Sequence, residues 1–324
     1  LIAINGDEGE PGTFKDKLYL ETDPHRFLEG ALIALKVMNA KQIYLYLRDE
    51  YPVAIEILRR EILKLENDHL IKKNTMILRR GAGAYICGEE SAMIESIEGK
   101  RGLPRHRPPY VAQKGLFGKP TLVHNIETIF CIRDILEKGA EWFANQGKNE
   151  SKGFHSYSVS GRIKKPGVKV APAGTTVQEL IDNYCGGMLQ DHIFKGYLPG
   201  GASGGILPAK YNKIPLDYGS KELTDLGCFL GSAAIVVLSD KDNMKDVALN
   251  ILKFFEEESC GQCTPCRVGT EKTVKIMKEK IWNKEKLEDL SEVMSEASIC
   301  GLGQAASNPL KSVMKYFEEE ITYE

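Results

Sequence analysis

The chain has 324 residues, enough for two or three domains at about 100–200 residues per domain. Hydrophobic residues make up 42% and charged residues 27%, which excludes a disordered chain. The 43 basic and 45 acidic side chains give a net charge of −2, so we expect no nucleic-acid partner. No apolar run reaches the ~18–20 residues of a membrane helix, so direct membrane insertion is not expected.

Alternating strands and helices are predicted over residues 1–150. The apolar pattern indicates strands over 1–5, 42–47 and 75–79, and helices over 25–38, 51–64, 91–97 and 125–138, with a long proline-rich loop over 99–120. Asp23 and Pro24 stand where the first of these helices would begin. Strands and helices in this order predict βαβ units and a mostly parallel sheet. Because the chain starts at Leu1 in a strand, we expect the natural protein to begin further upstream.

Composition changes near residue 150, where a polar, turn-forming segment covers 147–153. Residues 151–240 are predicted to form short strands with one helix over 176–184, capped by Thr175, and a last strand over 233–238. Residues 241–324 are predicted to be almost entirely helical apart from a cysteine-rich segment.

Four of the eight cysteines form one pattern near the C-terminus. Cys260, Cys263 and Cys266 follow the spacing C-x2-C-x2-C, and Cys300 comes 34 positions later. Three closely spaced thiolates and a distant fourth are typical of [4Fe–4S] ligation. Zinc is the alternative, although zinc sites usually pair two C-x2-C units. Because eight cysteines are too few for a disulfide scaffold of this length, a cytoplasmic protein is expected, one that meets a membrane only through partners.

The remaining cysteines and two acidic, glycine-rich loops have different predicted roles. Each of the other cysteines is isolated and is predicted to be a small buried hydrophobe: Cys87, Cys131, Cys185 and Cys228. The two loops cover 5–12 and 81–90, and each follows a predicted strand. Glycines there would let backbone N–H groups approach a phosphate or a flat ring, and carboxylates would accept from sugar hydroxyls. Two ordinary tight turns would explain the same spacing equally well.

Long motifs along the whole chain resemble one known family. They are N-G-D-E-G-E-P-G-T-F-K-D, G-A-G-A-Y-I-C-G-E-E, R-H-R-P-P-Y, G-K-P-T-L-V-H-N-I-E-T, E-S-C-G-Q-C-T-P-C-R and I-C-G-L-G. These segments are similar to the NADH-binding flavoprotein subunit family. Its members include the NADH-oxidising subunit of complex I, the diaphorase subunits of NAD-linked hydrogenases and the beta subunit of NAD-dependent formate dehydrogenase. Four segments look most like the formate dehydrogenase beta subunit: R-D-E-Y-P, G-G-A-S-G-G-I-L-P-A, G-C-F-L-G-S-A-A-I-V-V-L and A-S-I-C-G-L-G-Q-A-A.

The resemblance implies an α/β fold in three domains. A Rossmann-like domain for FMN and NADH would cover 1–150, and a ubiquitin-like α+β module (a soluble-ligand-binding beta-grasp) with its return strand would cover 151–240. A helical bundle carrying the iron–sulfur cluster would cover 241–324. The implied cofactors are FMN, NAD(H) and one [4Fe–4S] cluster.

The resemblance also implies the site residues. The flavin would contact Asn5, Asp7, Glu8, Gly88, Glu89 and Asn125, with Val123 and His124 beside it. NADH would contact Glu10, Tyr85 and Glu90, with Arg107 and Tyr110 from the proline-rich loop. The cluster would be held by Cys260, Cys263, Cys266 and Cys300. No side chain is expected to act as a catalytic acid or base, because hydride and electron transfer belong to the cofactors.

Two departures from the family pattern stand out. The family's first glycine-rich segment, which lies upstream of the acidic loop and carries a lysine near the flavin phosphate, is not in this sequence. His124 stands where complex I members usually carry asparagine, and an imidazole can replace one hydrogen bond of that amide.

The implied function is an NAD(H) oxidoreductase subunit that passes electrons between NAD(H), FMN and the cluster. The first choice is the beta subunit of an NAD-dependent formate dehydrogenase, and the alternatives are the corresponding subunit of complex I or of an NAD-linked hydrogenase. A non-catalytic relay or scaffold subunit that has lost its flavin is the rival from another class. The implied partners are a small thioredoxin-like [2Fe–2S] subunit and a catalytic subunit with further clusters, with molybdenum or tungsten in the formate dehydrogenase case.

Overall fold

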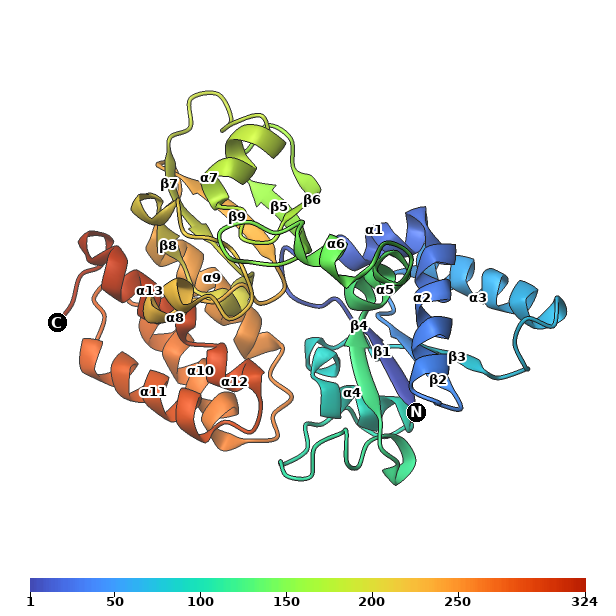
Figure 1. The fold of residues 1–324 in the computed structure, drawn as a ribbon. Helices are drawn as coiled ribbons and strands as arrows, with labels where there is room; N and C mark the ends of the chain where they lie inside the picture. The colour runs from blue at the N-terminus through green and yellow to red at the C-terminus, as the bar shows by residue number, and fades with distance from the viewer. The chain divides into compact units, whose positions relative to one another are not determined.

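The computed structural model describes residues 1–324, which form two compact units (Figure 1). Unit 1 comprises Leu1–Gly9 and Phe14–Trp142, and unit 2 comprises Glu10–Thr13 and Phe143–Glu324. The short helix α6 (Ala140–Ala144) contains the point where the chain passes from one unit to the other. The three-part division at residues 150 and 240 stays a prediction.

Unit 1 is built on a parallel sheet, as the sequence predicts, but the sheet has four strands and only the first three are predicted. The strands are β1 (Ile2–Gly6), β2 (Ile43–Leu47), β3 (Met76–Arg80) and β4 (Leu122–Asn125). Their order across the sheet is β3-β2-β1-β4, and all pairings are parallel. The two central strands are almost continuously apolar because helices cover both faces of the sheet.

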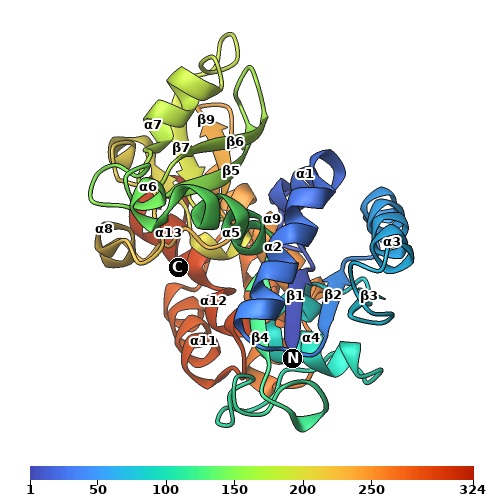
Figure 2. The ribbon, with the colours of Figure 1, turned by 45° about the vertical axis from the view of Figure 1, so that its right-hand side comes forward.

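Helices lie on both faces of the unit 1 sheet (Figures 1 and 2). Successive strand residues direct their side chains to opposite faces, so each face has its own contacts with the helices. Ile2 and Ile4 of β1 pack in one core with Phe27 of the second helix, and Tyr46 of β2 reaches Ser96 on the other face through its hydroxyl, at 2.8 Å. The helices are α1 (Lys15–Thr22), α2 (Pro24–Val37), α3 (Pro52–Asn67), α4 (Glu90–Ile97) and α5 (Ile126–Lys138), with the 3-10 turns η1 (Tyr85–Gly88) and η2 (Leu116–Gly118). Asp23 caps α2, since its carboxylate accepts from the backbone N–H of Arg26, as the sequence predicts.

Helix α1 does not follow from the sequence pattern, because its cap and its buried face are unusual. Its N-cap residue, Phe14, makes no side-chain cap hydrogen bond. The carboxylate of Glu8 takes over that role and accepts from the backbone N–H groups of Asp16 (2.9 Å) and Lys17 (3.3 Å). The face that α1 buries includes the charged residues Lys15 and Asp16, so it shows no apolar stripe.

Unit 2 contains a five-stranded mixed sheet. Its strands are β5 (Phe154–Gly161), β6 (Gly167–Pro172), β7 (Phe194–Leu198), β8 (Leu207–Pro208) and β9 (Ala234–Ser239), in the order β6-β5-β9-β7-β8. Only β5 and β9 pair in parallel. Short helical segments connect the strands: α7 (Val177–Glu179), the π-helical turn η3 (Leu180–Tyr184), η4 (Ala202–Gly204), η5 (Ala209–Tyr211) and α8 (Lys221–Asp225).

The predicted cap of the helix after β6 is wrong by one residue. Thr176, not Thr175, caps α7, and it forms a capping box with Glu179. A capping box needs the acidic side chain three residues after the cap, which selects Thr176. The hydroxyl of Thr175 donates instead to the carbonyl of Pro172, at 2.7 Å.

The C-terminal part of unit 2 is helical, as predicted. It consists of α9 (Met244–Glu257), α10 (Thr264–Met277), α11 (Lys284–Ala297), α12 (Gly301–Ala305), α13 (Asn308–Tyr316) and the turn η6 (Glu318–Glu320). Trp282, between α10 and α11, is fully buried, and its indole N–H donates to the carbonyl of Met277 at 3.1 Å. None of the helices in residues 1–324 has the length and apolar character needed to cross a membrane.

The buried cap Glu8 generates a prediction about stability and pH. Burial, followed by the charge of Asp16, raises the pKa of Glu8 from its ordinary value of 4.5 to about 7. The folded protein therefore holds this proton longer than the unfolded chain, so the stability it contributes is lost as pH rises from about 4.5 to 7. Between pH 5 and 7.5, we expect the free energy of unfolding to fall by about 2 kcal/mol less in Glu8→Gln than in the wild type.

Urea unfolding of both proteins across that pH range measures the effect. Glu56→Gln, at an exposed position of α3, is the control and should follow the wild type. Parallel stability–pH curves for wild type and Glu8→Gln would contradict the prediction.

Candidate functional site

The order of the strands in unit 1 creates a topological switch point at one edge of the sheet. Strands β2 and β3 lie on one side of β1, and β4 lies on the other, so the chain changes direction at β1 and β4. Ligands of open parallel sheets bind outside the carboxyl ends of the strands at such a switch point. Asn5 and Asn125, which end or nearly end these two strands, are register partners there. The predicted residues Val123 and His124 precede Asn125 on β4.

The two glycine-rich loops meet at this edge. The side-chain amide of Asn5 donates to the carbonyl of Gly88 at 2.8 Å, and its carbonyl oxygen accepts from the backbone N–H of Asp7 at 3.0 Å. A Cβ atom on Gly88 would lie 3.1 Å from the carbonyl oxygen of Asp7, while one on Gly83 would meet nothing within 4 Å. The loops therefore form a joined, open backbone surface that a ring or phosphate could approach closely.

Asn125 is held in place by a buried lysine that sequence reasoning missed. Its amide oxygen accepts from the Nζ of Lys15 at 3.0 Å and from the N–H of Glu127 at 3.0 Å, and its nitrogen donates to Asp16 at 2.7 Å. Burial alone would lower the pKa of Lys15, but the charges of Asp16 and Glu127 raise it, so the lysine stays charged. The structure thus places Asn125 and Glu8 in polar contacts of the fold, and any part they play in binding includes supporting α1 and α5.

The N-terminus of α4 gathers three of the predicted residues. The Oε2 of Glu89 accepts from the backbone N–H groups of Ser91 (3.0 Å) and Ala92 (2.9 Å) and caps the helix. The guanidinium of Arg107, from the proline-rich loop, pairs with Glu89 at 2.5 Å and with Glu90 at 2.7 Å. Tyr110 lies on the same loop and is 54% exposed. This arrangement places two carboxylates and a cation at the start of α4, and the exposed ring of Tyr110 follows three residues after Arg107 along the loop.

Glu10 and Tyr85 lie in different settings. Glu10 falls within unit 2, where its Oε1 accepts from the backbone N–H of Ser203 at 2.8 Å and from its hydroxyl at 2.7 Å. Sequence reasoning missed Ser203, which lies 193 positions away in the glycine-rich segment 200–205. Tyr85 begins η1 in unit 1, and a Cβ atom on Gly9 would lie 3.0 Å from its ring.

His124 is uncharged at physiological pH. Burial lowers the pKa of its imidazole below the ordinary value of 6.5. The ring can therefore donate or accept one hydrogen bond without adding positive charge to this edge of the sheet.

Two of the four predicted cluster ligands stand at helix N-termini. Cys263 is the N-cap residue of α10 and Cys300 is the N-cap residue of α12, and neither helix has a side-chain cap hydrogen bond. Cys266 lies in the first turn of α10. The free N–H groups at a helix N-terminus favour negative charge, which suits thiolate ligands.

The four cysteines are also close enough to influence one another. The pKa of Cys266 is raised to about 11, mainly by burial and also by the charges of Cys263, Cys300 and Cys260, against a hydrogen bond from Ser259 that lowers it. No three His, Cys, Asp or Glu side chains in residues 1–324 gather around a single point as the ligands of one metal ion would. Four neighbouring thiols, three of them at the N-termini of α10 and α12, are the donor set that a [4Fe–4S] cluster requires.

Close packing fixes the segment after Cys300. A Cβ atom on Gly303 would lie 2.4 Å from the Oγ of Ser298 and 2.9 Å from the Cβ of Cys266. A glycine is needed there for α12 to approach α10, so the motif I-C-G-L-G has a steric cause.

The other four cysteines lie outside this group. Cys87, Cys185 and Cys228 are buried, as predicted for small apolar side chains, whereas Cys131 is only half-buried. Cys87 has a close neighbour, because a Cβ atom on Gly102 would lie 2.5 Å from its sulfur.

Two family models match the N-terminal and the C-terminal parts of the chain. The family model described as the Nuo51 FMN-binding domain matches residues 1–134, and that of the NADH-ubiquinone oxidoreductase-F iron-sulfur binding region matches residues 246–324. The chain is 39% identical to the NADH-quinone oxidoreductase F subunit 2 of Rhizobium meliloti, over 99% of this chain and 79% of that protein. It is 40% identical to the NADH-quinone oxidoreductase F subunit of Aquifex aeolicus, over 98% of this chain and 76% of that protein.

A solved structure of an NAD+-reducing hydrogenase also matches nearly the whole chain. The NAD+-reducing [NiFe]-hydrogenase in its H2-reduced state superposes with a TM-score of 0.89 at 33% identity, over 98% of this chain. The chain spans about half (55%) of that hydrogenase chain. Together with the two NADH-quinone oxidoreductase relatives, this match shows that the chain belongs to the family of NADH-binding subunits of NAD(H)-dependent oxidoreductases, whose cofactors are FMN and a [4Fe–4S] cluster.

Proposed function

We propose that this chain oxidises NADH, or reduces NAD+ in the reverse direction, and exchanges the electrons with a partner protein through its four-cysteine site. The observation that carries the proposal is the combination, in one chain, of two joined glycine-rich loops at the switch point of a parallel sheet and four neighbouring cysteines. When bound, FMN accepts a hydride and releases single electrons, which links two-electron and one-electron chemistry.

The residues of the two glycine-rich loops and at the start of α4 have distinct proposed roles toward the nucleotides. Asn5 and Gly88 hold the two loops together, and with the neighbouring Asp7 they would contact the flavin. Glu90 and Arg107 form the NADH contacts on unit 1, where a carboxylate accepts from sugar hydroxyls and a guanidinium donates to a phosphate. Glu89 orients Arg107 and at the same time caps α4.

The other predicted contacts within unit 1 are two aromatic rings, Tyr85 and the exposed Tyr110, and the neutral ring of His124. Glu10 belongs to unit 2, where its carboxylate, fixed by Ser203, is proposed as a further NADH contact.

In the cluster site, we propose that Cys260, Cys263, Cys266 and Cys300 are the ligands. The N-termini of α10 and α12 stabilise the negative charge of the ligated thiolates. Thr264 and Arg267 lie beside Cys263 and Cys266 at exposed positions, so the start of α10 is the surface where we place the contact with an electron-transfer partner.

For the partner enzyme, we keep the formate dehydrogenase assignment as the finer proposal. It is supported by four sequence segments, among them the glycine-rich segment 200–205, whose Ser203 binds Glu10. The NADH-quinone oxidoreductase and hydrogenase relatives favour a quinone or [NiFe] partner as the alternatives. A small [2Fe–2S] subunit would accompany the chain in each case.

The cluster assignment predicts the effect of removing one ligand. We expect Cys263→Ser to abolish the [4Fe–4S] signal in electron paramagnetic resonance of the reduced protein, because one of four thiolate ligands is lost. Cys131→Ser, at the half-buried cysteine of α5, is the matched control and should keep the signal. An unchanged signal in Cys263→Ser, or zinc bound in place of iron, would show that the assignment is wrong.

The NADH site predicts a loss of catalytic efficiency in Glu90→Gln. Removal of one charge-assisted hydrogen bond should cost roughly 1.5–3 kcal/mol, or about 10- to 150-fold in kcat/KM for NADH. Flavin fluorescence should show FMN still bound, and Glu56→Gln should behave like the wild type. Unchanged kinetics in Glu90→Gln would show that Glu90 does not contact NADH.

The chain is predicted to work inside a larger assembly. Beyond the four-cysteine site, its other cysteines are scattered, so it offers no second centre of its own to receive electrons. Native purification with mass spectrometry and metal analysis tests this prediction. Molybdenum or tungsten with formate-dependent NAD+ reduction supports the finer proposal, while nickel or a quinone-reducing partner supports an alternative. A stable monomer that reduces its physiological acceptor unaided would contradict the prediction of a larger assembly.

A further inference from the structure

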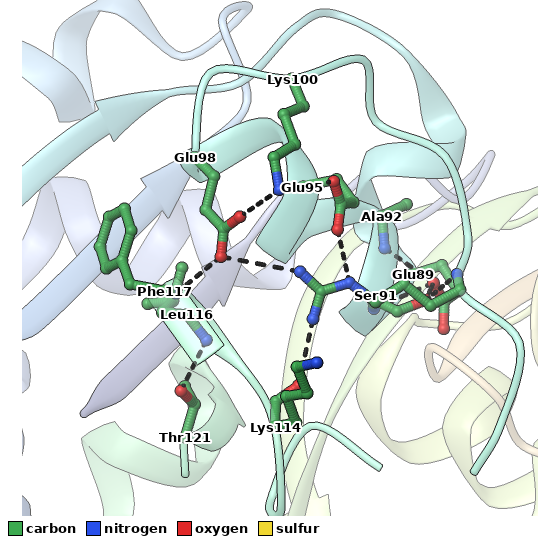
Figure 3. A network of polar contacts seen from close by, with 11 residues as sticks. Glu89, Ser91, Ala92, Glu95, Glu98, Lys100, Lys114, Leu116, Phe117 and Thr121 are labelled. Atoms are coloured by element: carbon green, nitrogen blue, oxygen red, sulfur yellow. Dashed lines mark hydrogen bonds and ion pairs between the residues drawn. The ribbon is translucent and has the colours of Figure 1, made fainter. Parts of the chain in front are cut away.

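The proline-rich loop over residues 99–120 is closed at its base by one arginine. The guanidinium of Arg105 contacts Glu95 at 2.5 Å and Glu98 at 3.6 Å, on the end of α4 and the residue after it, and donates to the carbonyl of Lys114 at 3.1 Å. Figure 3 shows that Glu95, Glu98 and Lys114 face a common point between α4 and the loop. Arg105 thus ties the outgoing and returning limbs of the loop to α4.

Glu98 reinforces the same closure. It accepts from the Nζ of Lys100 at 2.7 Å and from the backbone N–H of Phe117 at 2.6 Å (Figure 3). Burial alone would raise the pKa of Glu98, but hydrogen bonds from Lys100 and Phe117 lower it below its ordinary value of 4.5. Glu98 is therefore ionised at neutral pH, so its charge is available to Arg105.

The backbone of Arg105 provides a second connection, directed at the N-terminus of α4. Its N–H donates to the Oγ of Ser91 at 2.9 Å, and the Ser91 hydroxyl donates to the Oε2 of Glu89 at 2.5 Å. Two residues further along the loop, Arg107 pairs with the other oxygen of Glu89 and with Glu90. The two arginines therefore contact one carboxylate, one of them through Ser91 and the other directly.

We propose that Arg105 is a positioning residue of the NADH site, which sets the register of the loop so that Arg107 reaches the two carboxylates at the start of α4. The inference rests on the proposed function, because it takes Glu90 and Arg107 to be nucleotide contacts. Arg105 itself touches no nucleotide in this account and acts through Arg107 and Glu89.

The chemistry of the site requires an arginine. The contacts of Arg105 point in three directions, to Glu95, Glu98 and the carbonyl of Lys114, and a planar guanidinium supplies donors in these fixed directions. A lysine at this position would keep the charge but would present a single ammonium group, so it could not join both limbs of the loop. The side chain of Arg105 is 26% exposed, so solvent screens its ion pairs less than it would screen a fully exposed pair.

The experiment compares five variants of the full chain loaded with FMN: Arg105→Gln, Arg105→Lys, Arg107→Gln, Lys114→Gln and the double variant Arg105→Gln with Glu95→Gln. NAD+ binding is measured by isothermal titration calorimetry, and KM and kcat for NADH are measured separately. Lys114→Gln is the matched control, since it removes a positive charge from the same loop but keeps the carbonyl that accepts from Arg105. Hydrogen–deuterium exchange reports the order of residues 106–113.

We expect Arg105→Gln to raise the dissociation constant of NAD+ and the KM for NADH about tenfold, with kcat changed less than about twofold. Arg105→Lys should give an intermediate loss, and Lys114→Gln should match the wild type. Exchange should rise in residues 106–113 of Arg105→Gln but not in the strands of the sheet. Adding Glu95→Gln to Arg105→Gln should cause no further loss, because the two side chains act as one unit.

Two outcomes would overturn the proposal and leave the proposed function intact. In the first, Arg105→Gln binds NAD+ like the wild type while Arg107→Gln binds it weakly. In the second, Arg105→Gln and Arg105→Lys both lose FMN or melt early, which would make Arg105 a support of the fold. If Arg107→Gln also binds NAD+ like the wild type, the loop carries no nucleotide contact and this part of the proposed function falls as well. Absence of NAD(H) binding in the wild type would refute the proposed function itself.

Discussion

Parallel pairing of β1 with both β2 and β4 is the constraint on which the site in unit 1 depends. It brings the segments that follow all four strands to one edge of the sheet and leaves a switch point between β1 and β4. The hydrogen bond from Asn5 to Gly88 then joins two loops that are 83 positions apart. From Gly88 the chain turns directly into the cap of α4, so the carboxylates of Glu89 and Glu90 are placed by the same sheet edge.

Several charged side chains near the predicted site residues stabilise the local fold. Lys15 is buried yet charged, and it fixes Asn125 through one hydrogen bond. Glu8 caps α1 from a distance and accepts from the hydroxyl of Tyr51 at 2.8 Å. Glu10 is fixed by Ser203 in unit 2. An acidic loop that resembles a ligand site therefore also contains structural carboxylates, and only the structure separates the two kinds.

Local signals in the sequence predicted the first three strands of the unit 1 sheet, the long helices and the cluster segment, but not strand β4. Apolar periodicity located β2 and α5, and the spacing of the cysteines selected Cys260 and its three partners before any geometry was known. Helix α1 could not be predicted in this way, because its cap comes from Glu8 and its buried face is charged. The contact between Glu10 and Ser203 joins residues 193 positions apart, and no local pattern reports it.

The role of Arg105 shows the same limit for the proline-rich loop. The sequence shows several arginines in this segment and does not distinguish them, whereas the structure gives Arg105 to the base of the loop and Arg107 to the carboxylates of α4. Such assignments depend on the distances between donors and acceptors in the folded chain.

An anaerobic titration of the isolated chain with NADH tests the central claim most directly. The protein is prepared with its cluster, with and without FMN, and the flavin absorbance and the paramagnetic signal of the cluster are followed together. The account predicts that NADH bleaches the flavin and reduces the cluster only when FMN is present. Bound FMN that NADH does not bleach, or a cluster that NADH reduces equally well without FMN, would contradict it.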